Sequence, residues 1–297
     1  MPVLPYPVDV SALNYLSRIG LRARVAVEGL MAGIHRSRSF GWNIEFADYR
    51  EYTKGDDIRH IDWRVFARTD RFYIKQFEEE TNMRVYLVLD QSRSMDYTSG
   101  DDSKLNYAAT LAAVLAYLFV RQRDSVGLVS FDRQIRQFLP PRKSPHHLRR
   151  IWETLEGLEP GEETDVRGNL HSLAGMVRRR GLMILISDLL DDPEAMIHGL
   201  AHFRHKKFEV IVLHVLDPAE VEFPFRGNSI FQDMESTKWV ETSPRAIRKA
   251  YREALEGFME TVRRGCHQAN VDYEFLPTST PVERALLRYL SLRASRS

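Results

Sequence analysis

An acidic residue and two serines stand at alternate positions directly after a long apolar run. Residues 83–95 read MRVYLVLDQSRSM, and Asp90, Ser92 and Ser94 carry the oxygen-bearing side chains. The run predicts a buried β-strand, and alternate positions on the loop that follows can direct their oxygens at one point. One carboxylate and two hydroxyls are hard ligands with little total negative charge, which suits Mg²⁺ or Mn²⁺. We expect a divalent-metal site with one coordination position open to a carboxylate from outside.

A helix cap is the alternative interpretation of the two serines. Aspartate and serine are common after strands because their side chains bond to nearby backbone groups. In that case Ser92 or Ser94 would cap a helix that begins near Ser103.

Two later segments favour the metal site. Residues 159–170, EPGEETDVRGNL, predict a loop that leads into a helix, with Thr164 at the turn. Residues 181–192, GLMILISDLLDD, predict a second buried strand, which delivers Asp188. The three loops follow one another in the order DxSxS, Thr, Asp, and in this they resemble the metal sites of von Willebrand factor A-like domains, which draw their ligands from three such loops in that order.

Strands and helices alternate from residue 84 onward, which predicts an α/β fold: a mostly parallel, Rossmann-type sheet with helices on both faces. Ligands of such sheets bind outside the carboxyl ends of the strands, where Asp90 and Asp188 are expected. The expected strands are 84–90, 125–131, 134–140, 181–187, 207–216 and 271–277. The expected helices are 103–122, 145–158, 167–179, 193–204 and 244–264.

The first part of the chain has a different character, so we expect two units. Residues 1–83 form an N-terminal extension, and residues 84–297 form the α/β domain with a C-terminal helix. Residues 1–35 predict one or two helices with a glycine-rich break.

Aromatic and charged residues are dense in residues 39–80. Such a segment can stack on single-stranded nucleic acid, but the acids interleaved in it would repel a phosphate backbone. We expect instead that it packs on the α/β domain, with Trp42, Trp63 and Phe66 supplying much of the buried area.

Composition describes an ordinary globular chain. The net charge is +1, from 42 basic and 41 acidic residues, so charge gives no reason to expect nucleic acid. A single cysteine, Cys266, excludes an intrachain disulfide and a thiolate cluster. The apolar stretch 105–120 is shorter than the roughly 20 residues of a membrane span. We expect a soluble, cytoplasmic protein without a membrane span.

A long motif resembles the bacterial domain-of-unknown-function 58 family. It reads FxDYREYxxGDDIRxIDWRVxART, followed by KQFEEE and LVLDQSRSM, and the likeness covers about residues 35–215. The resemblance implies a von Willebrand factor A-like domain with an N-terminal extension packed beside it and a metal-ion-dependent adhesion site. It also implies association with a MoxR-type AAA+ ATPase. The metal ligands that it implies are Asp90, Ser92, Ser94, Thr164 and Asp188.

Docking is the chemistry expected of such a site. The two aspartates would hold waters of the metal shell, the hydroxyls would coordinate directly, and an acidic residue of the ATPase or its client would complete the shell. A metal-dependent hydrolase or phosphatase using Asp90 and Asp188, and a metal-free scaffold, are the alternatives. Enzymatic activity is not expected, because position 92 is serine where a haloacid-dehalogenase-like phosphatase needs a second acid. The sequence also contains no GxSxG, GxxxxGK[ST], GxGxxG or HExxH motif.

Three histidines lie at helical spacing in the predicted helix 193–204 and just beyond it: His198, His202 and His205. They could bind a transition metal, but no acid or cysteine joins them on that face. We expect a solvated face instead.

Overall fold

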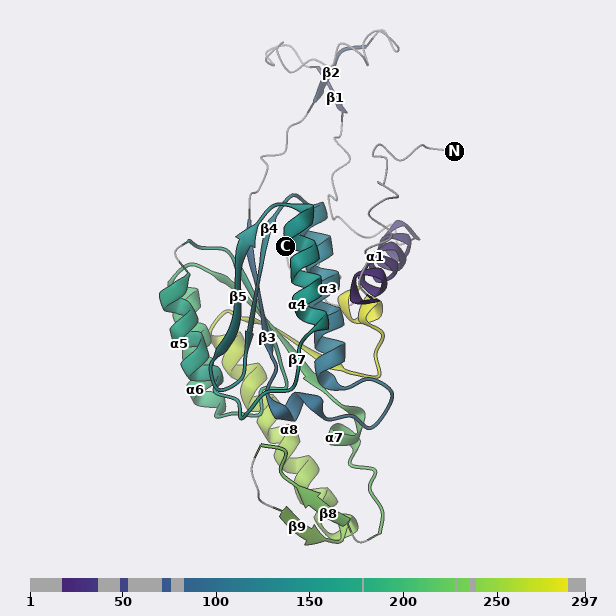
Figure 1. The fold of residues 1–297 in the computed structure, drawn as a ribbon, viewed down its shortest axis with the longest axis vertical. Helices are drawn as coiled ribbons and strands as arrows, with labels where there is room; N and C mark the ends of the chain where they lie inside the picture. Colours follow the sequence, from purple (N-terminus) through teal and green to yellow (C-terminus); the bar gives the residue numbers. More distant parts are fainter. Residues whose placement is uncertain are drawn as a thin grey trace.

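A six-stranded, mostly parallel sheet forms the centre of the protein (Figure 1). The structure is a computed structural model, and it describes residues 18–36, 49–52, 71–75, 83–177, 179–227, 229–235 and 239–287. The strand order is β10-β7-β6-β3-β4-β5, and β5 alone runs antiparallel to its neighbour in this sheet of the described chain. The strands are β3 (Arg84–Asp90), β4 (Ser125–Phe131), β5 (Ile135–Arg142), β6 (Leu182–Ser187), β7 (Glu209–Leu216) and β10 (Asp272–Pro277).

Helices cover both faces of the sheet, each over its own hydrophobic core. One core contains residues of α1 (Arg18–Arg36), α3 (Lys104–Arg121) and α4 (Pro145–Glu156). The other contains residues of α5 (Val166–Met176), α6 (Pro193–His205) and α8 (Pro244–Gln268). Alternate residues of β3 enter opposite cores, as the pleat of a strand requires. The predicted α/β fold class, a mostly parallel Rossmann-type sheet with helices on both faces, is confirmed.

The helix α3 lies against the sheet with most of its length buried, as its alanine-rich sequence predicts. Ser103 caps it, because its side chain accepts a hydrogen bond from the Asn106 amide at 3.3 Å. The alternative that Ser92 or Ser94 caps this helix is therefore wrong. Among the described residues, no helix combines the length and the apolar character that crossing a bilayer requires.

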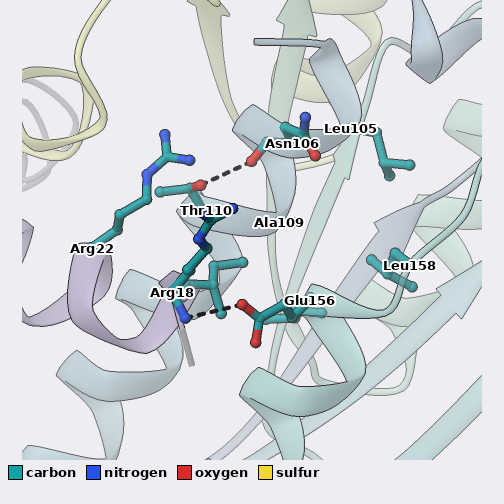
Figure 2. Close-up of a pocket in the computed structure, with 10 residues that line it drawn as sticks. Arg18, Arg22, Leu105, Asn106, Ala109, Thr110, Glu156 and Leu158 are labelled. Atoms are coloured by element: carbon teal, nitrogen blue, oxygen red, sulfur yellow. Dashed lines mark hydrogen bonds between the residues drawn. The ribbon is translucent and has the colours of Figure 1, made fainter. Parts of the chain in front are cut away.

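The N-terminal helix α1 packs against α3 and α4. The Arg18 amide donates to Glu156 Oε1 at 2.9 Å, beside a small pocket between the helices (Figure 2). Gly20 lies so near the Trp152 ring that an added Cβ would be 2.7 Å from it. The expected glycine-rich break is wrong, because α1 runs through Gly29 and Gly33 without interruption.

Little of the aromatic segment 39–80 belongs to the described residues. Two short antiparallel strands are seen there, β1 (Tyr49–Glu51) and β2 (Tyr73–Lys75). Trp42, Trp63 and Phe66 lie outside the described residues, so their packing stays a prediction.

A segment after β7 forms structure that the periodicity does not predict. It contains the short helix α7 (Pro218–Glu222) and the antiparallel hairpin of β8 (Ser229–Gln232) and β9 (Trp239–Thr242). The hairpin and the first half of α8 extend beyond the carboxyl edge of the sheet, at the bottom of Figure 1. The hairpin therefore lies beside the carboxyl edge of the sheet, where ligands are expected to bind.

Candidate metal centre

The strand order reverses at β3, which places two aspartates side by side. β3 pairs with β4 on one side and with β6 on the other, both parallel to it. Leu89 is aligned with Ile186, so Asp90 and Asp188 follow at the same edge of neighbouring strands. Such a switch point opens a crevice between oppositely directed crossovers, where α/β sheets bind ligands.

The loop after β3 gathers the first three predicted ligands. Asp90 Oδ1 accepts a hydrogen bond from the Ser92 amide at 2.9 Å, which turns the chain back on itself. Ser92 Oγ and Ser94 Oγ then lie 3.1 Å apart. Asp90 and Ser92 are fully buried, and Ser94 is nearly so.

Thr164 reaches the same place from the loop between α4 and α5. The Gly161 amide donates to the Gln91 carbonyl at 2.6 Å, which holds this loop against the first. Glycine is required there, because an added Cβ would lie 2.2 Å from Asp132 Oδ2. Thr164 Oγ1 donates to Asp90 Oδ2 at a long 3.4 Å. The structure thus brings the predicted threonine to the predicted aspartate.

Ser187, at the end of β6, contributes a further hydroxyl to the group around Asp90, and the sequence did not predict this role. Its hydroxyl donates to Asp90 Oδ2 at 2.6 Å and accepts from the Leu189 amide at 2.9 Å. Leu189 has a φ of 57°, a left-handed conformation that is costly for leucine and is held by burial. The signal was present in the sequence, since Ser187 directly precedes Asp188 at the end of a buried strand.

A buried lysine contacts one of the predicted metal ligands, and the sequence did not predict this contact. Lys104, the first residue of α3, donates to Asp188 Oδ2 at 2.8 Å and to Glu220 Oε1 at 2.6 Å. The side chains of Lys104 and Asp188 have no exposed area, and that of Glu220 is 17% exposed. Asp188 therefore has a cationic partner supplied by the protein itself.

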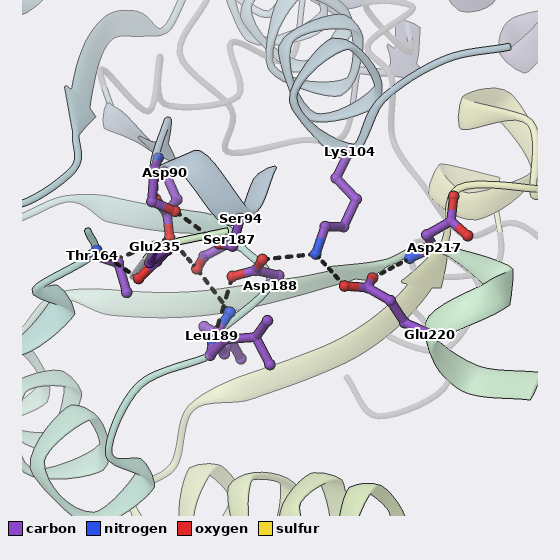
Figure 3. A network of polar contacts seen from close by, with 12 residues as sticks. Asp90, Ser94, Lys104, Thr164, Ser187, Asp188, Leu189, Asp217, Glu220 and Glu235 are labelled. Carbon is purple, nitrogen blue, oxygen red and sulfur yellow. Dashed lines mark hydrogen bonds and ion pairs between the residues drawn. The ribbon is translucent and has the colours of Figure 1, made fainter. Parts of the chain in front are cut away.

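The other end of this contact is fixed by α7. Glu220 Oε2 accepts from the Asp217 amide at 2.8 Å, and Asp217 Oδ1 accepts from the Ala219 amide at 2.7 Å. This is a capping box, and the sequence Asp217-Pro218-Ala219-Glu220 has its spacing. Figure 3 shows the polar contacts from Asp188 through Lys104 and Glu220 to Asp217.

A glutamate from the hairpin also enters the site. Glu235 lies between β8 and β9, and its Oε2 accepts from the Thr164 amide at 3.2 Å. Its Oε1 is buried and has no hydrogen-bond partner among the described residues. Figure 3 shows Glu235 in one group with Asp90, Ser94, Thr164 and Ser187. Nothing in the local sequence marks this residue.

The two aspartates differ in their electrostatic surroundings. Burial and the negative charge of Asp188 raise the pKa of Asp90 to about 7, although hydrogen bonds from Ser187 and Ser92 oppose the shift. Burial alone would lower the pKa of Lys104, but Asp188 and Glu220 outweigh it and raise that pKa. Within the described ranges, Asp90 is bonded to an amide and to hydroxyls and to no cationic group.

The donor set at this edge suits a hard cation. All the donors are carboxylate or hydroxyl oxygens, which Mg²⁺ and Mn²⁺ prefer. Adjacent ligands of an octahedral Mg²⁺ at about 2.1 Å lie about 3.0 Å apart, close to the 3.1 Å between the two serine hydroxyls. Among the described residues, no three His, Cys, Asp or Glu side chains form a metal-binding group, so a cation here needs the hydroxyls.

The helical histidines do not form a second centre in the described chain. His198, His202 and His205 are exposed on α6, as a solvated face requires. Cys266 is a free, buried thiol, and burial raises its pKa to about 12. The exposure of the three histidines agrees with the expected solvated face.

The fold and this edge together define an α/β domain with a mostly parallel sheet and a polar site at its switch point. The family described as "Protein of unknown function DUF58" matches residues 48–258. The chain belongs to this family. The expected membership in this family is thereby confirmed. The match begins at residue 48, later than the predicted 35, and extends to residue 258, past the predicted end at residue 215.

Relatives of this chain occur in mycobacteria. Uncharacterized proteins of Mycobacterium tuberculosis and Mycobacterium bovis are each 30% identical to it over 227 residues. Each match covers 74% of this chain and 70% of the relative.

Solved structures resemble the chain more distantly. The conserved hypothetical protein BatB of Bacteroides thetaiotaomicron is 16% identical and covers 72% of this chain and all of its own, with a TM-score of 0.49. The SpRpn10 VWA domain is 10% identical, covers 69% of this chain and 94% of its own, and has a TM-score of 0.43. At these identities the likeness concerns the path of the chain and no residue of the site.

Proposed function

We propose that this protein is a docking module that binds Mg²⁺ or Mn²⁺ at the carboxyl edge of its sheet and holds an acidic side chain of a partner. The observation that carries the proposal is the surroundings of Asp90. This carboxylate is fully buried, lies beside three loops that supply hydroxyls, and has no cationic partner among the described residues. A buried charge without a partner is costly, and a divalent cation would supply the missing positive charge.

The residues divide into two roles. Ser92, Ser94 and Thr164 would coordinate the cation directly, and Asp90 and Asp188 would hold waters of its shell. The bound cation would supply positive charge to a carboxylate from outside. Lys104 offsets the charge of Asp188, so the cation keeps a larger share of its own charge for that outside ligand.

The partner that we propose is a MoxR-type AAA+ ATPase or its client protein. The family resemblance supports this choice. The sequence contains no phosphate-binding loop, so any ATP-driven step would be carried out by the partner.

A metal-free scaffold is the second candidate, and the contact between Lys104 and Asp188 favours it. An ammonium group already bonds to one of the two carboxylates, so the edge is partly neutralised without a cation. Hydrolysis with Asp90 and Asp188 remains the alternative raised by the sequence.

Binding to the ATPase in Mg²⁺ and in EDTA tests the proposal. Docking predicts binding to the full chain in Mg²⁺, loss in EDTA, and loss for the Ser92→Ala/Ser94→Ala variant while its fold is kept. Equal binding in EDTA would place the contact on another surface. Turnover of a model phosphate ester in Mg²⁺ would support the hydrolase, and indifference of melting temperature to Mg²⁺ would support the scaffold.

A further inference from the structure

The hairpin of β8 and β9 places a carboxylate at the candidate metal centre. Glu235 Oε2 accepts from the Thr164 amide at 3.2 Å. The hydroxyl of the same threonine faces Asp90 Oδ2 at 3.4 Å. A single residue, Thr164, therefore links Glu235 to the carboxylate at the centre of the site.

The second oxygen of Glu235 has no partner in the described chain. Oε1 is buried from solvent and makes no hydrogen bond with any described residue. A buried carboxylate oxygen in this state costs free energy, since it has lost water without gaining a donor. A cation bound among the neighbouring hydroxyls would satisfy it.

Packing contacts fix the hairpin in place, and they therefore also fix the position of Glu235. Phe231 of β8 stacks on Phe223 with ring centroids 5.3 Å apart, and Phe223 packs on Tyr251 of α8 at 4.5 Å. Arg248 of α8 donates to the carbonyls of Phe223 and Phe225 at 3.0 and 2.7 Å. These contacts hold the segment before the hairpin to α8 and, through Phe231, the hairpin to that segment, on the side of the molecule where β3 ends (Figure 1).

The loop itself is also shaped to present the glutamate. Asp233 Oδ1 accepts from the Glu235 amide at 3.0 Å, an Asx turn that closes the chain just before Glu235. On the opposite strand, Glu241 is exposed and pairs with Ile230, two residues beyond the Gln232–Trp239 pair that borders this turn. The two glutamates therefore share an element and differ in their access to the site.

We infer that Glu235 is an internal ligand of the metal centre, whose carboxylate fills the position that a partner's acidic residue would otherwise take. This inference rests on the proposed function. An outside carboxylate would have to displace Glu235, so the hairpin regulates access to the centre. The partner that this site accepts is accordingly one that presents an acidic side chain on a loop able to displace Glu235.

Mn²⁺ binding to the full chain, followed by water-proton relaxation, tests the inference. A coordinated carboxylate excludes water from the metal shell, so removing it admits water and raises the relaxation enhancement per bound Mn²⁺. Glu235→Ala should raise this enhancement and weaken Mn²⁺ binding by roughly 10-fold or more. Glu235→Gln, which retains the acceptor for the Thr164 amide, should shift both quantities in the same direction. Glu241→Gln is the matched control and should change neither.

One outcome would overturn only the internal ligand, and another would overturn the proposed metal centre as well. Wild-type affinity and relaxation enhancement in both Glu235 variants would overturn the internal ligand and leave the metal centre standing. Absence of Mn²⁺ binding to the wild-type chain would overturn both. Melting curves in EDTA check that the variants are folded.

Discussion

The ammonium nitrogen of Lys104 lies 2.8 Å from Oδ2 of Asp188, and neither side chain is exposed. The same nitrogen is bonded to Glu220, which is fixed by the capping box of α7. Lys104 thus connects the end of β6 to the segment after β7. One carboxylate of the candidate centre is paired by the protein, and Asp90 has no cationic partner among the described residues.

Replacing Lys104 by methionine should destabilise the protein strongly in the absence of divalent metal. The change leaves Asp188 and Glu220 buried without a cation, which costs about 3–5 kcal/mol in the free energy of unfolding. Urea unfolding in EDTA measures this cost. Mg²⁺ should then stabilise the variant more than the wild type, because the site has become more negative.

Arg22→Met is the control for this change. Arg22 pairs with Asp102 at 2.9 Å, but the two side chains are 53% and 44% exposed. An exposed pair contributes at most about 1 kcal/mol. If Lys104→Met lowered the free energy of unfolding by a similarly small amount, the buried contact of Lys104 with Asp188 and Glu220 would not be an important source of stability.

Replacing Thr164 by valine should weaken Mg²⁺ binding by about 10-fold, because it removes a hydroxyl that faces Asp90 and retains the shape of the side chain. Titration calorimetry measures the affinity. Thr154→Val removes a hydroxyl that donates to the Arg150 carbonyl on the solvent side of α4, and it should leave the affinity unchanged. Wild-type affinity in Thr164→Val would exclude the threonine from the metal shell.

Asp124 should make the protein less stable as the pH rises through the acid range. Burial raises its pKa to about 6, and the hydrogen bond from the Met83 amide and the charge of Lys143 oppose the shift only in part. A pKa above the ordinary value means that the folded state binds the proton more tightly than the unfolded chain. Stability from this group is therefore present below the ordinary pKa of 3.8 and is lost as the pH rises to about 6.

Asp124→Asn should remove that loss, since asparagine retains the acceptor for Met83 without the charge. The expected gain is about 1–3 kcal/mol at pH 7 and much less at pH 4. Guanidinium unfolding of both proteins at the two pH values gives the difference. An equal effect of the substitution at both pH values would contradict the assignment.

Gly20→Ala should loosen α1 from the rest of the molecule. The added Cβ would meet the Trp152 ring at 2.7 Å, and such overpacking costs about 1–3 kcal/mol. Gly175→Ala in α5 meets nothing within 4 Å and should stabilise by about 0.5–1 kcal/mol, because alanine favours a helix. Thermal melting compares the two, and a neutral Gly20→Ala would contradict close packing of α1 on α4.

The sheet and its helices follow from patterns that are local in sequence. Apolar runs such as 181–187 predict buried strands, and polar residues at their carboxyl ends predict a common edge once a parallel sheet is assumed. Asp90, Ser92, Ser94 and Asp188 could therefore be named from the sequence, because each lies at the end of a predicted strand or just after it. Thr164 lies on the loop between α4 and α5, so it was implied by the family resemblance, and its place in the group depends on the contact of that loop with Gln91.

Lys104 and Glu235 could not be found in that way. A lysine in the first turn of a helix is ordinarily solvated, and Lys104 is buried only because α7 and the end of β6 enclose it. Glu235 lies in a turn between two short strands whose other residues are largely exposed. Its position depends on the packing of Phe223 and Phe231 against α8, a tertiary arrangement with no periodic signal.

Titration calorimetry of Mg²⁺ into the wild-type chain and into Asp90→Asn tests the central claim most directly. Asparagine retains the acceptor for the Ser92 amide and removes the charge, so the loop keeps its shape. We predict saturable binding to the wild-type chain, with a stoichiometry of about one cation per chain, and loss of binding in Asp90→Asn. No binding to the wild type, or equal affinity in the two proteins, would contradict a metal centre at Asp90.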